Sequence, residues 1–168
     1  MTFRWHQTTT NRPNRYMIRI LVIDDEPLAL QQLAAYAKKI PYFEIVGQCL
    51  SAMEAREIMD NEQIDAIFVD INMPDINGMD FVRSLAAPPI VVFTTAYSEY
   101  AVDGYKVDAV DYLLKPFSLD DFRRAAMKVK KRYELENNVG MAHSSQPNAI
   151  QHTTTPLPSA NNNDLFLK

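Results

Sequence analysis

The chain has 168 residues, of which 47% are hydrophobic and 23% are charged, a composition typical of one globular domain with polar tails. Its formal net charge of -4 argues against nucleic-acid binding by this segment itself, and its single cysteine, Cys49, excludes an internal disulfide. No apolar stretch approaches the roughly 20 residues of a membrane span, so we expect no membrane association and a cytoplasmic location.

The first 16 residues have no hydrophobic period and are expected to be a disordered extension. After them, apolar runs typical of buried strands alternate with helical patterns. The expected strands are residues 18–23, 43–49, 65–69, 90–94 and 109–114, and the expected helices are 27–40, 51–61, 78–85, one from about Ser98, and 119–137. This alternation predicts a single α/β domain over residues 17–137, with a five-stranded parallel sheet, doubly wound, in a flavodoxin-like arrangement.

The last expected helix has the best-marked start. Ser118 and Asp121 have the spacing of a capping box, and the helix becomes rich in basic residues toward its end, which are interpreted as a solvated face. Residues 138–163 are rich in Ser, Asn, Pro and Thr and are expected to be a flexible linker. Residues 164–168 are interpreted as the start of a truncated further domain.

Polar side chains follow four of the expected strands. Asp24 and Asp25 come after the first strand, Asp70 after the third, Thr95 after the fourth and Lys115 after the fifth. The carboxyl ends of parallel strands meet at one edge of a sheet, so these side chains are expected to converge. Crowded carboxylates are typical of a Mg²⁺ site, which leaves an aspartate able to attack a phosphoryl group. The lysine and the threonine would then bind the phosphoryl oxygens.

Each of these residues has a simpler interpretation when it is taken alone. Asp24 and Asp25 are also suited to cap the following helix, and Asp70 is suited to begin a turn. Thr95 is equally consistent with a hydroxyl that is hydrogen-bonded at the end of a strand, and Lys115 with a surface lysine. Their order along the chain, each at the end of an apolar run, favours a joint site that makes and holds an aspartyl phosphate.

Four motifs carry a resemblance to a known family: LVIDDEP, VDINMPDINGMDF, VVFTTAYSEYA and DYLLKPF. With them, residues 17–137 resemble the receiver domain of two-component response regulators. The resemblance implies a Mg²⁺ cofactor, a cis peptide bond between Lys115 and Pro116, and no enzyme activity beyond the domain's own phosphorylation and dephosphorylation. It also implies one role for each matched residue: Asp70 as phosphoacceptor, Asp24 and Asp25 as the acidic pair for the metal, Asn72 as a metal ligand through its backbone carbonyl, Lys115 as the phosphate-binding lysine, Thr95 as the switch hydroxyl and Tyr112 as the switch aromatic.

The segment AYSEYAVDGYKVDAVDYLLKPF is most similar to receivers joined to LytTR-type DNA-binding domains, and residues 164–168 are similar to the opening strand of such a domain. This resemblance implies a sensor histidine kinase as partner, and transcription regulation with DNA bound only through the missing domain. It also implies a homodimer through the face of the fourth helix, fifth strand and fifth helix. Several aromatic side chains belong to that region, and an equal alternative is that half of them lie in the core: Tyr97, Tyr100, Tyr105 and Tyr112.

Three other classes of protein share some of these features. A phosphohydrolase of the haloacid dehalogenase type would place its nucleophile in a D-x-D motif after the first strand, where this chain has Asp24-Asp25-Glu26. A flavodoxin-like redox module would need a phosphate-binding loop there, and the acids would repel a flavin phosphate. A stand-alone receiver that acts through protein–protein binding stays open as the alternative function.

Overall fold

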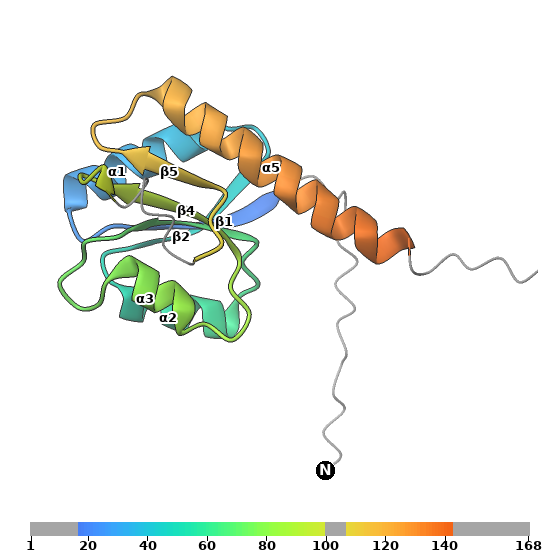
Figure 1. Cartoon of the computed structure of the whole chain (residues 1–168), viewed down its shortest axis with the longest axis horizontal. Coiled ribbons are helices and arrows are strands. Elements are labelled where there is room, and N and C mark those ends of the chain that lie inside the picture. The colour runs from blue at the N-terminus through green and yellow to red at the C-terminus, as the bar shows by residue number, and fades with distance from the viewer. Residues whose placement is uncertain (1–16, 100–106, 143–168) are drawn as a thin grey trace, which may run out of the picture.

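The computed structural model describes residues 17–99 and 107–142. At its centre is a parallel sheet with the strand order β2-β1-β3-β4-β5 (Figure 1). The predicted five-stranded parallel sheet is thus confirmed. The strands are β1 (Ile18–Ile23), β2 (Phe43–Cys49), β3 (Ala66–Asp70), β4 (Ile90–Thr95) and β5 (Asp111–Leu114).

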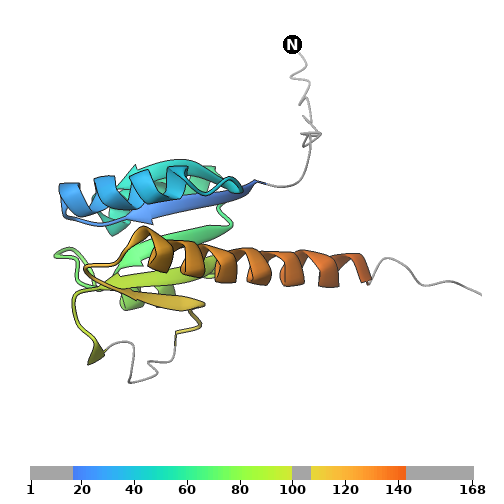
Figure 2. The ribbon, with the colours of Figure 1, turned by 90° about the horizontal axis from the view of Figure 1, so that it is seen from above.

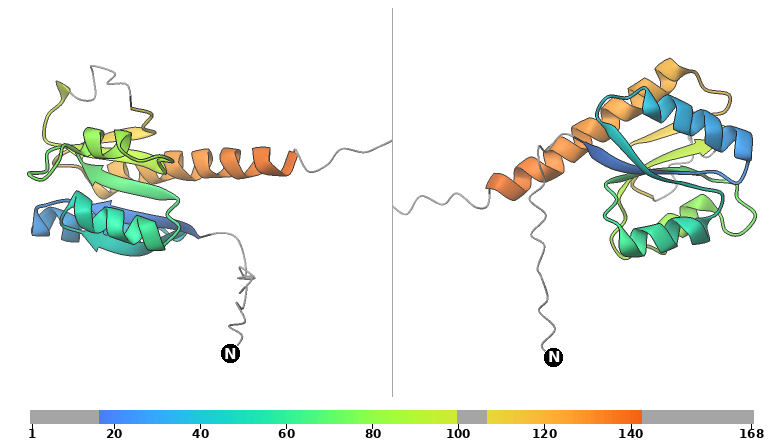
Figure 3. Two further views of the ribbon diagram at one scale, coloured as in Figure 1. Left: turned by 90° about the horizontal axis from the view of Figure 1, so that it is seen from below. Right: turned by 180° about the vertical axis from the view of Figure 1, so that it is seen from behind.

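Helices cover both faces of the sheet, as a doubly wound fold requires. The helices are α1 (Pro27–Lys38), α2 (Ala52–Asn61), α3 (Gly78–Arg83) and α5 (Leu119–Ala142). Figures 1 and 3 show α1 and α5 on one face and α2 and α3 on the other. The helix expected from about Ser98 lies largely outside the described residues. Within the described ranges, no helix combines the length and the apolar character needed to cross a membrane.

The sheet separates two hydrophobic clusters, which explains why its strands are almost continuously apolar. All five residues of β3 are buried, because this central strand is covered on both sides. Phe68 faces the α1–α5 side, where its ring stacks on Phe122 with centroids 4.8 Å apart. Its neighbours Ile67 and Val69 face the α2–α3 side. Alternation along one strand therefore determines which cluster each side chain joins.

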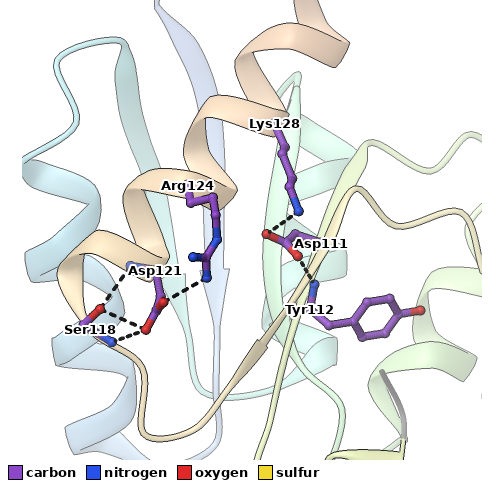
Figure 4. A network of polar contacts seen from close by, with 6 residues as sticks. All are labelled: Asp111, Tyr112, Ser118, Asp121, Arg124 and Lys128. Carbon is purple, nitrogen blue, oxygen red and sulfur yellow. Dashed lines mark hydrogen bonds and ion pairs between the residues drawn. The ribbon is translucent and has the colours of Figure 1, made fainter. Parts of the chain in front are cut away.

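The start of α5 confirms the predicted capping box. The Asp121 carboxylate accepts hydrogen bonds from the backbone N–H and the hydroxyl of Ser118, and the Asp121 N–H donates to Ser118 Oγ at 3.1 Å (Figure 4). The basic residues further along are more than a solvated face. Lys128 Nζ lies 3.1 Å from Asp111 Oδ2 on β5, and Arg132 pairs with Asp108.

Several predicted boundaries were wrong. α5 continues to Ala142, so residues 138–142 are helical and the predicted linker does not begin at 138. The ion pairs of Lys130 with Glu134 and of Arg132 with Glu136 stabilise the part of α5 that precedes this extension. The end of α5 projects past the sheet in Figure 2.

Other elements are shorter than expected. α1 ends at Lys38 rather than at residue 40, since Pro41 disfavours helical geometry in the residue before it. α3 ends at Arg83 rather than at residue 85, and β5 begins at Asp111 rather than at residue 109. The predicted output-domain start at residues 164–168 lies outside the described residues.

Candidate functional site

Three carboxylates meet at the carboxyl edge of the sheet. Asp24 and Asp25 follow β1, and Asp70 is the last residue of the neighbouring strand β3. The register pairs Ile23 with Val69, which places Asp24 beside Asp70. One carboxylate oxygen from each of the three acids lies within 4.8 Å of the others. The structure therefore brings together the three acids that the sequence singled out.

Asp24 is fully buried and has a partner for each oxygen. Its Oδ1 accepts a hydrogen bond from the backbone N–H of Glu26 at 3.0 Å, and its Oδ2 lies 2.7 Å from Lys115 Nζ. The N-cap residue of α1 is Glu26, whose side chain makes no capping hydrogen bond. The alternative in which Asp24 and Asp25 cap the first helix is therefore wrong.

Asp70 is an unusual carboxylate because it is only 4% exposed and has two acidic neighbours. Burial, together with repulsion from Asp24 and Asp25, raises the pKa of Asp70 to about 6. Lys115, whose Nζ lies 3.6 Å from Asp70 Oδ2, and the backbone N–H of Asn72 act in the opposite direction. Asp70 is thus a weaker acid than usual, and Lys115 and the N–H of Asn72 partly stabilise its negative charge.

Lys115 follows β5 directly, and its backbone is held by the neighbouring strand β4. Its backbone N–H donates to the carbonyl of Thr95 at 2.7 Å, and the expected cis peptide bond to Pro116 is present. Burial acts to lower the pKa of the Lys115 ammonium, but its bond to Asp24 and the charge of Asp70 raise the pKa overall. The lysine is therefore a permanent positive charge, and the alternative of a surface lysine is wrong.

The donor set fits a hard divalent cation. Asp25 Oδ1 is buried and has no hydrogen-bond partner among the described residues, although it lies in the cluster formed with Asp24 and Asp70. Oxygen atoms of carboxylates are the ligands that Mg²⁺ prefers, and a cation would remove the repulsion among three acids in so small a volume. Asn72, the fourth predicted ligand, follows Asp70 by two residues and is tied to it through its backbone N–H.

The two predicted switch residues lie on the strands next to the cluster. Thr95 is 1% exposed, and its Oγ1 accepts a hydrogen bond from the backbone N–H of Tyr97 at 3.0 Å. The hydroxyl is thus engaged by the turn that follows β4. Tyr112 is half-buried, and its ring centroid lies 5.5 Å from that of Phe93. In Figure 4 its ring points away from the Asp111–Lys128 pair, toward the face of the sheet opposite α5.

Two residues near Asp70 were missed by the sequence reasoning. The N–H of Gly78 donates to the carbonyl of Ile71 at 2.7 Å, and a Cβ at this position would collide with the carbonyl of Asp70. The signal for it was the Asn77-Gly78 pair, which is typical of a turn. Thr94 is the register partner of Asp70 on β4 and is fully buried. Its signal was the Thr94-Thr95 doublet, whose members must face opposite sides of the sheet.

Comparisons with known proteins agree with this geometry. A family model described as "Response regulator receiver domain" matches residues 20–127. The chain is 33% identical over 137 residues to "Sensory transduction protein LytR" of Staphylococcus haemolyticus (strain JCSC1435), covering 79% of this chain and 53% of that protein. It is also 33% identical over 143 residues to "Transcriptional regulatory protein LytR" of Staphylococcus aureus (strain MW2), covering 83% of this chain and 58% of that protein. The chain therefore spans about half the length of these relatives.

Solved structures show the same fold. The response regulatory domain of protein mrkE from Klebsiella pneumoniae superposes with a TM-score of 0.63 at 30% identity, covering 70% of this chain and 99% of that one. The response regulator protein TrrA from Thermotoga maritima, solved in complex with Mg(2+)-BeF, gives a TM-score of 0.59 at 29% identity, covering 67% of this chain and 99% of that one.

Proposed function

The chain belongs to the response regulator receiver family, and on that premise we propose that it accepts a phosphoryl group from a sensor histidine kinase on Asp70. The observation that carries the proposal is the position of Asp70, which is grouped with Asp24 and Asp25 while Lys115 lies against the same cluster. A nucleophile, a cation site and a phosphate-binding charge are thus available at one edge of the sheet.

In the proposed reaction, a carboxylate oxygen of Asp70 attacks the phosphorus atom of a phosphohistidine. A P–O bond forms, the P–N bond breaks, and its electron pair stays with the imidazole of the kinase. Lys115 places its positive charge beside the phosphoryl oxygens. A Mg²⁺ site would be formed by the carboxylates of Asp24, Asp25 and Asp70 and the carbonyl of Asn72, and the ion would supply positive charge that neutralises those oxygens. The structure of the similar protein TrrA, solved in complex with Mg(2+)-BeF, supports the proposal that this chain also binds Mg²⁺.

The phosphoryl group would then change the state of Thr95 and Tyr112. The Thr95 hydroxyl, now engaged by the N–H of Tyr97, moves to donate a hydrogen bond to a phosphoryl oxygen. Tyr112 fills the space that Thr95 leaves. The contact of the Tyr112 ring with Phe93, two residues before Thr95 on β4, supports this coupling because both tyrosine and threonine belong to the same packed region. The domain is a signalling module and not an enzyme that turns over an external substrate.

We further propose that the switch controls a homodimer through the fourth helix, β5 and α5. A large apolar side chain of this face, Leu114 on β5, is 47% exposed, and Met127 elsewhere on α5 is also exposed. Of the tyrosines expected there, Tyr97 is exposed and Tyr112 packs partly in the core, while Tyr100 and Tyr105 lie outside the described residues. Apolar and aromatic side chains are the usual anchors of such an interface.

The role of the whole protein is proposed from its relatives. The Staphylococcus aureus relative is named a transcriptional regulatory protein, and the present chain covers 58% of it. We propose that this receiver, residues 17–137, controls an attached DNA-binding domain of LytTR type and so regulates transcription. The alternative is a receiver that acts through protein–protein binding alone.

Intact-mass spectrometry tests the proposed acceptor. The protein is incubated with MgCl₂ and acetyl phosphate, with Asp70→Asn treated in parallel. We expect one base-labile phosphoryl adduct on the wild type and none on the variant. Equal modification of both proteins would show that Asp70 is not the acceptor.

A further inference from the structure

The hydroxyl of Thr94 is a buried polar group that the proposed reaction does not use. Thr94 is 0% exposed, and its Oγ1 has no hydrogen-bond partner among the described residues. A buried hydroxyl without a partner destabilises the fold, whereas valine has nearly the same shape and no polar group to satisfy. A threonine at this position therefore indicates that the protein adopts another state, in which the hydroxyl makes a hydrogen bond.

The position of Thr94 identifies its partner. In the ladder between β3 and β4, Thr94 is the register partner of Asp70, and on the other side it is paired with Leu113 of β5. Phe68 and Val92, which precede Asp70 and Thr94 by two residues, both belong to the cluster on the α1–α5 side. Since side chains alternate along a strand, Asp70 and Thr94 project from the same face of the sheet. Asp70 is thus the polar group beside the hydroxyl, and Leu113 offers none.

A backbone hydrogen bond keeps Asp70 and Thr94 side by side at the ends of β3 and β4. The N–H of Ile71, the residue after Asp70, donates to the carbonyl of Thr94 at 3.0 Å. Asp70 is only 4% exposed, so water has little access to its carboxylate and competes weakly with Thr94 for a hydrogen bond to it. In the resting state the carboxylate is drawn toward Lys115 and the N–H of Asn72.

We propose that Thr94 is a positioning residue for Asp70, whose carboxyl group accepts a hydrogen bond from the Thr94 hydroxyl during phosphoryl transfer. The bond forms as the carboxyl group turns to present one oxygen to phosphorus. The other oxygen, which would also bind the metal ion, keeps a second lone pair that accepts the hydrogen bond from Thr94. An interaction that is absent in the resting state and present in the reacting state accelerates the reaction. This inference rests on the proposed function, because it concerns the same acceptor.

The test compares Thr94→Val with the matched variant Thr94→Ser, which keeps the hydroxyl. Phosphorylation by phosphoramidate in MgCl₂ is followed by intact mass over time, and thermal unfolding of each protein is measured. We expect Thr94→Val to be phosphorylated about tenfold more slowly, with an unfolding midpoint equal to or above that of the wild type. Thr94→Ser is expected to retain a rate close to that of the wild type.

A purely structural role for the threonine predicts the reverse pattern, a lowered midpoint with an unchanged rate, and that result would overturn the inference. Thr94→Ala replaces the valine variant if the latter does not fold, with the same expected loss of rate. If the wild type is phosphorylated on Asp70 and the valine variant reacts equally fast, only the role of Thr94 fails. If the wild type is not phosphorylated at all, the proposed function fails and this inference fails with it.

Discussion

The ammonium group of Lys115 lies 2.7 Å from Oδ2 of Asp24, a carboxylate that is completely buried. The same ammonium is 3.6 Å from Asp70, so in this structure the lysine is bound more closely to a proposed metal ligand than to the proposed acceptor. A buried carboxylate that lost this partner would be left as an uncompensated charge. Lys115 therefore stabilises the resting site as well as being the expected phosphate-binding residue.

Replacing this lysine should consequently cost stability. We expect Lys115→Met to lower the free energy of unfolding by on the order of 3 kcal/mol in the absence of divalent cations. The matched control is Lys128→Met, which removes the half-exposed partner of Asp111 and is expected to cost no more than about 1 kcal/mol. Urea unfolding of both variants measures the difference, and equal losses would contradict a special role for the buried pair.

Divalent cations should stabilise the fold through the three acids. At a Mg²⁺ concentration tenfold above its dissociation constant, linkage predicts a gain of about 1.4 kcal/mol. Thermal unfolding with MgCl₂ and with EDTA measures this gain. Asp25→Asn, which alters the buried oxygen that has no hydrogen-bond partner within residues 17–99 and 107–142, should lose most of this gain. An undiminished Mg²⁺ effect in this variant would place the ion elsewhere.

Asp70 should make stability depend on pH in the direction opposite to that of most carboxylates. Because the pKa of Asp70 is raised to about 6, the folded protein holds a proton at pH values where the unfolded chain has released it. Lowering the pH from about 7 to about 5 should therefore add on the order of 1 kcal/mol of stability. Unfolding in EDTA at both pH values, in wild type and Asp70→Asn, isolates this contribution. The variant should lack the gain, and identical pH dependences would contradict the raised pKa.

Gly78 should be intolerant of a side chain. A Cβ here meets the backbone carbonyl of Asp70, which cannot rotate away, so Gly78→Ala is expected to cost about 1–3 kcal/mol and to slow phosphorylation by displacing the acceptor. Gly47→Ala is the control, since its Cβ meets the flexible ends of Ile58 and Leu21. Chemical denaturation and phosphorylation rates of both variants would reveal the contrast. A phosphorylation rate equal to that of the wild type in Gly78→Ala would show that the loop does not position Asp70.

The proposed dimer should appear on phosphorylation. Sedimentation velocity of the protein before and after full modification is expected to show a shift from monomer to dimer. Leu114→Lys, which places a charge at an exposed position of β5, should abolish the shift without affecting modification. An unchanged sedimentation profile after full phosphorylation would rule out this mode of output.

The fold and the acidic cluster could be predicted because they follow from local pattern. Continuous apolar runs mark strands covered on both faces, and parallel strands bring their carboxyl ends to one edge, so Asp24 and Asp70 were expected at the same edge. That they are direct neighbours follows from the strand order of the structure, in which β1 pairs with β3. The pairing of Lys115 with Asp24 could not be predicted, since it depends on side-chain geometry between residues that are distant in the sequence.

Two other features depend on tertiary context in the same way. The sequence does not indicate which residues Asp108 and Asp111 contact. In the structure, each forms an ion pair with a basic residue of α5. The position of the Thr94 hydroxyl beside Asp70, without a partner in the described part of the chain, could be recognised only from the register of β3 and β4. Sequence patterns report which face a residue occupies, whereas individual contacts across the fold require the assembled structure.

Chemical identification of the phosphorylated residue tests whether Asp70 is the acceptor. The protein is phosphorylated with acetyl phosphate in MgCl₂, the acyl phosphate is reduced with borohydride, and the peptides are sequenced by mass spectrometry. We predict homoserine at position 70 and at no other aspartate, with none formed in EDTA. Homoserine at Asp24 or Asp25 with Asp70 intact would contradict the account.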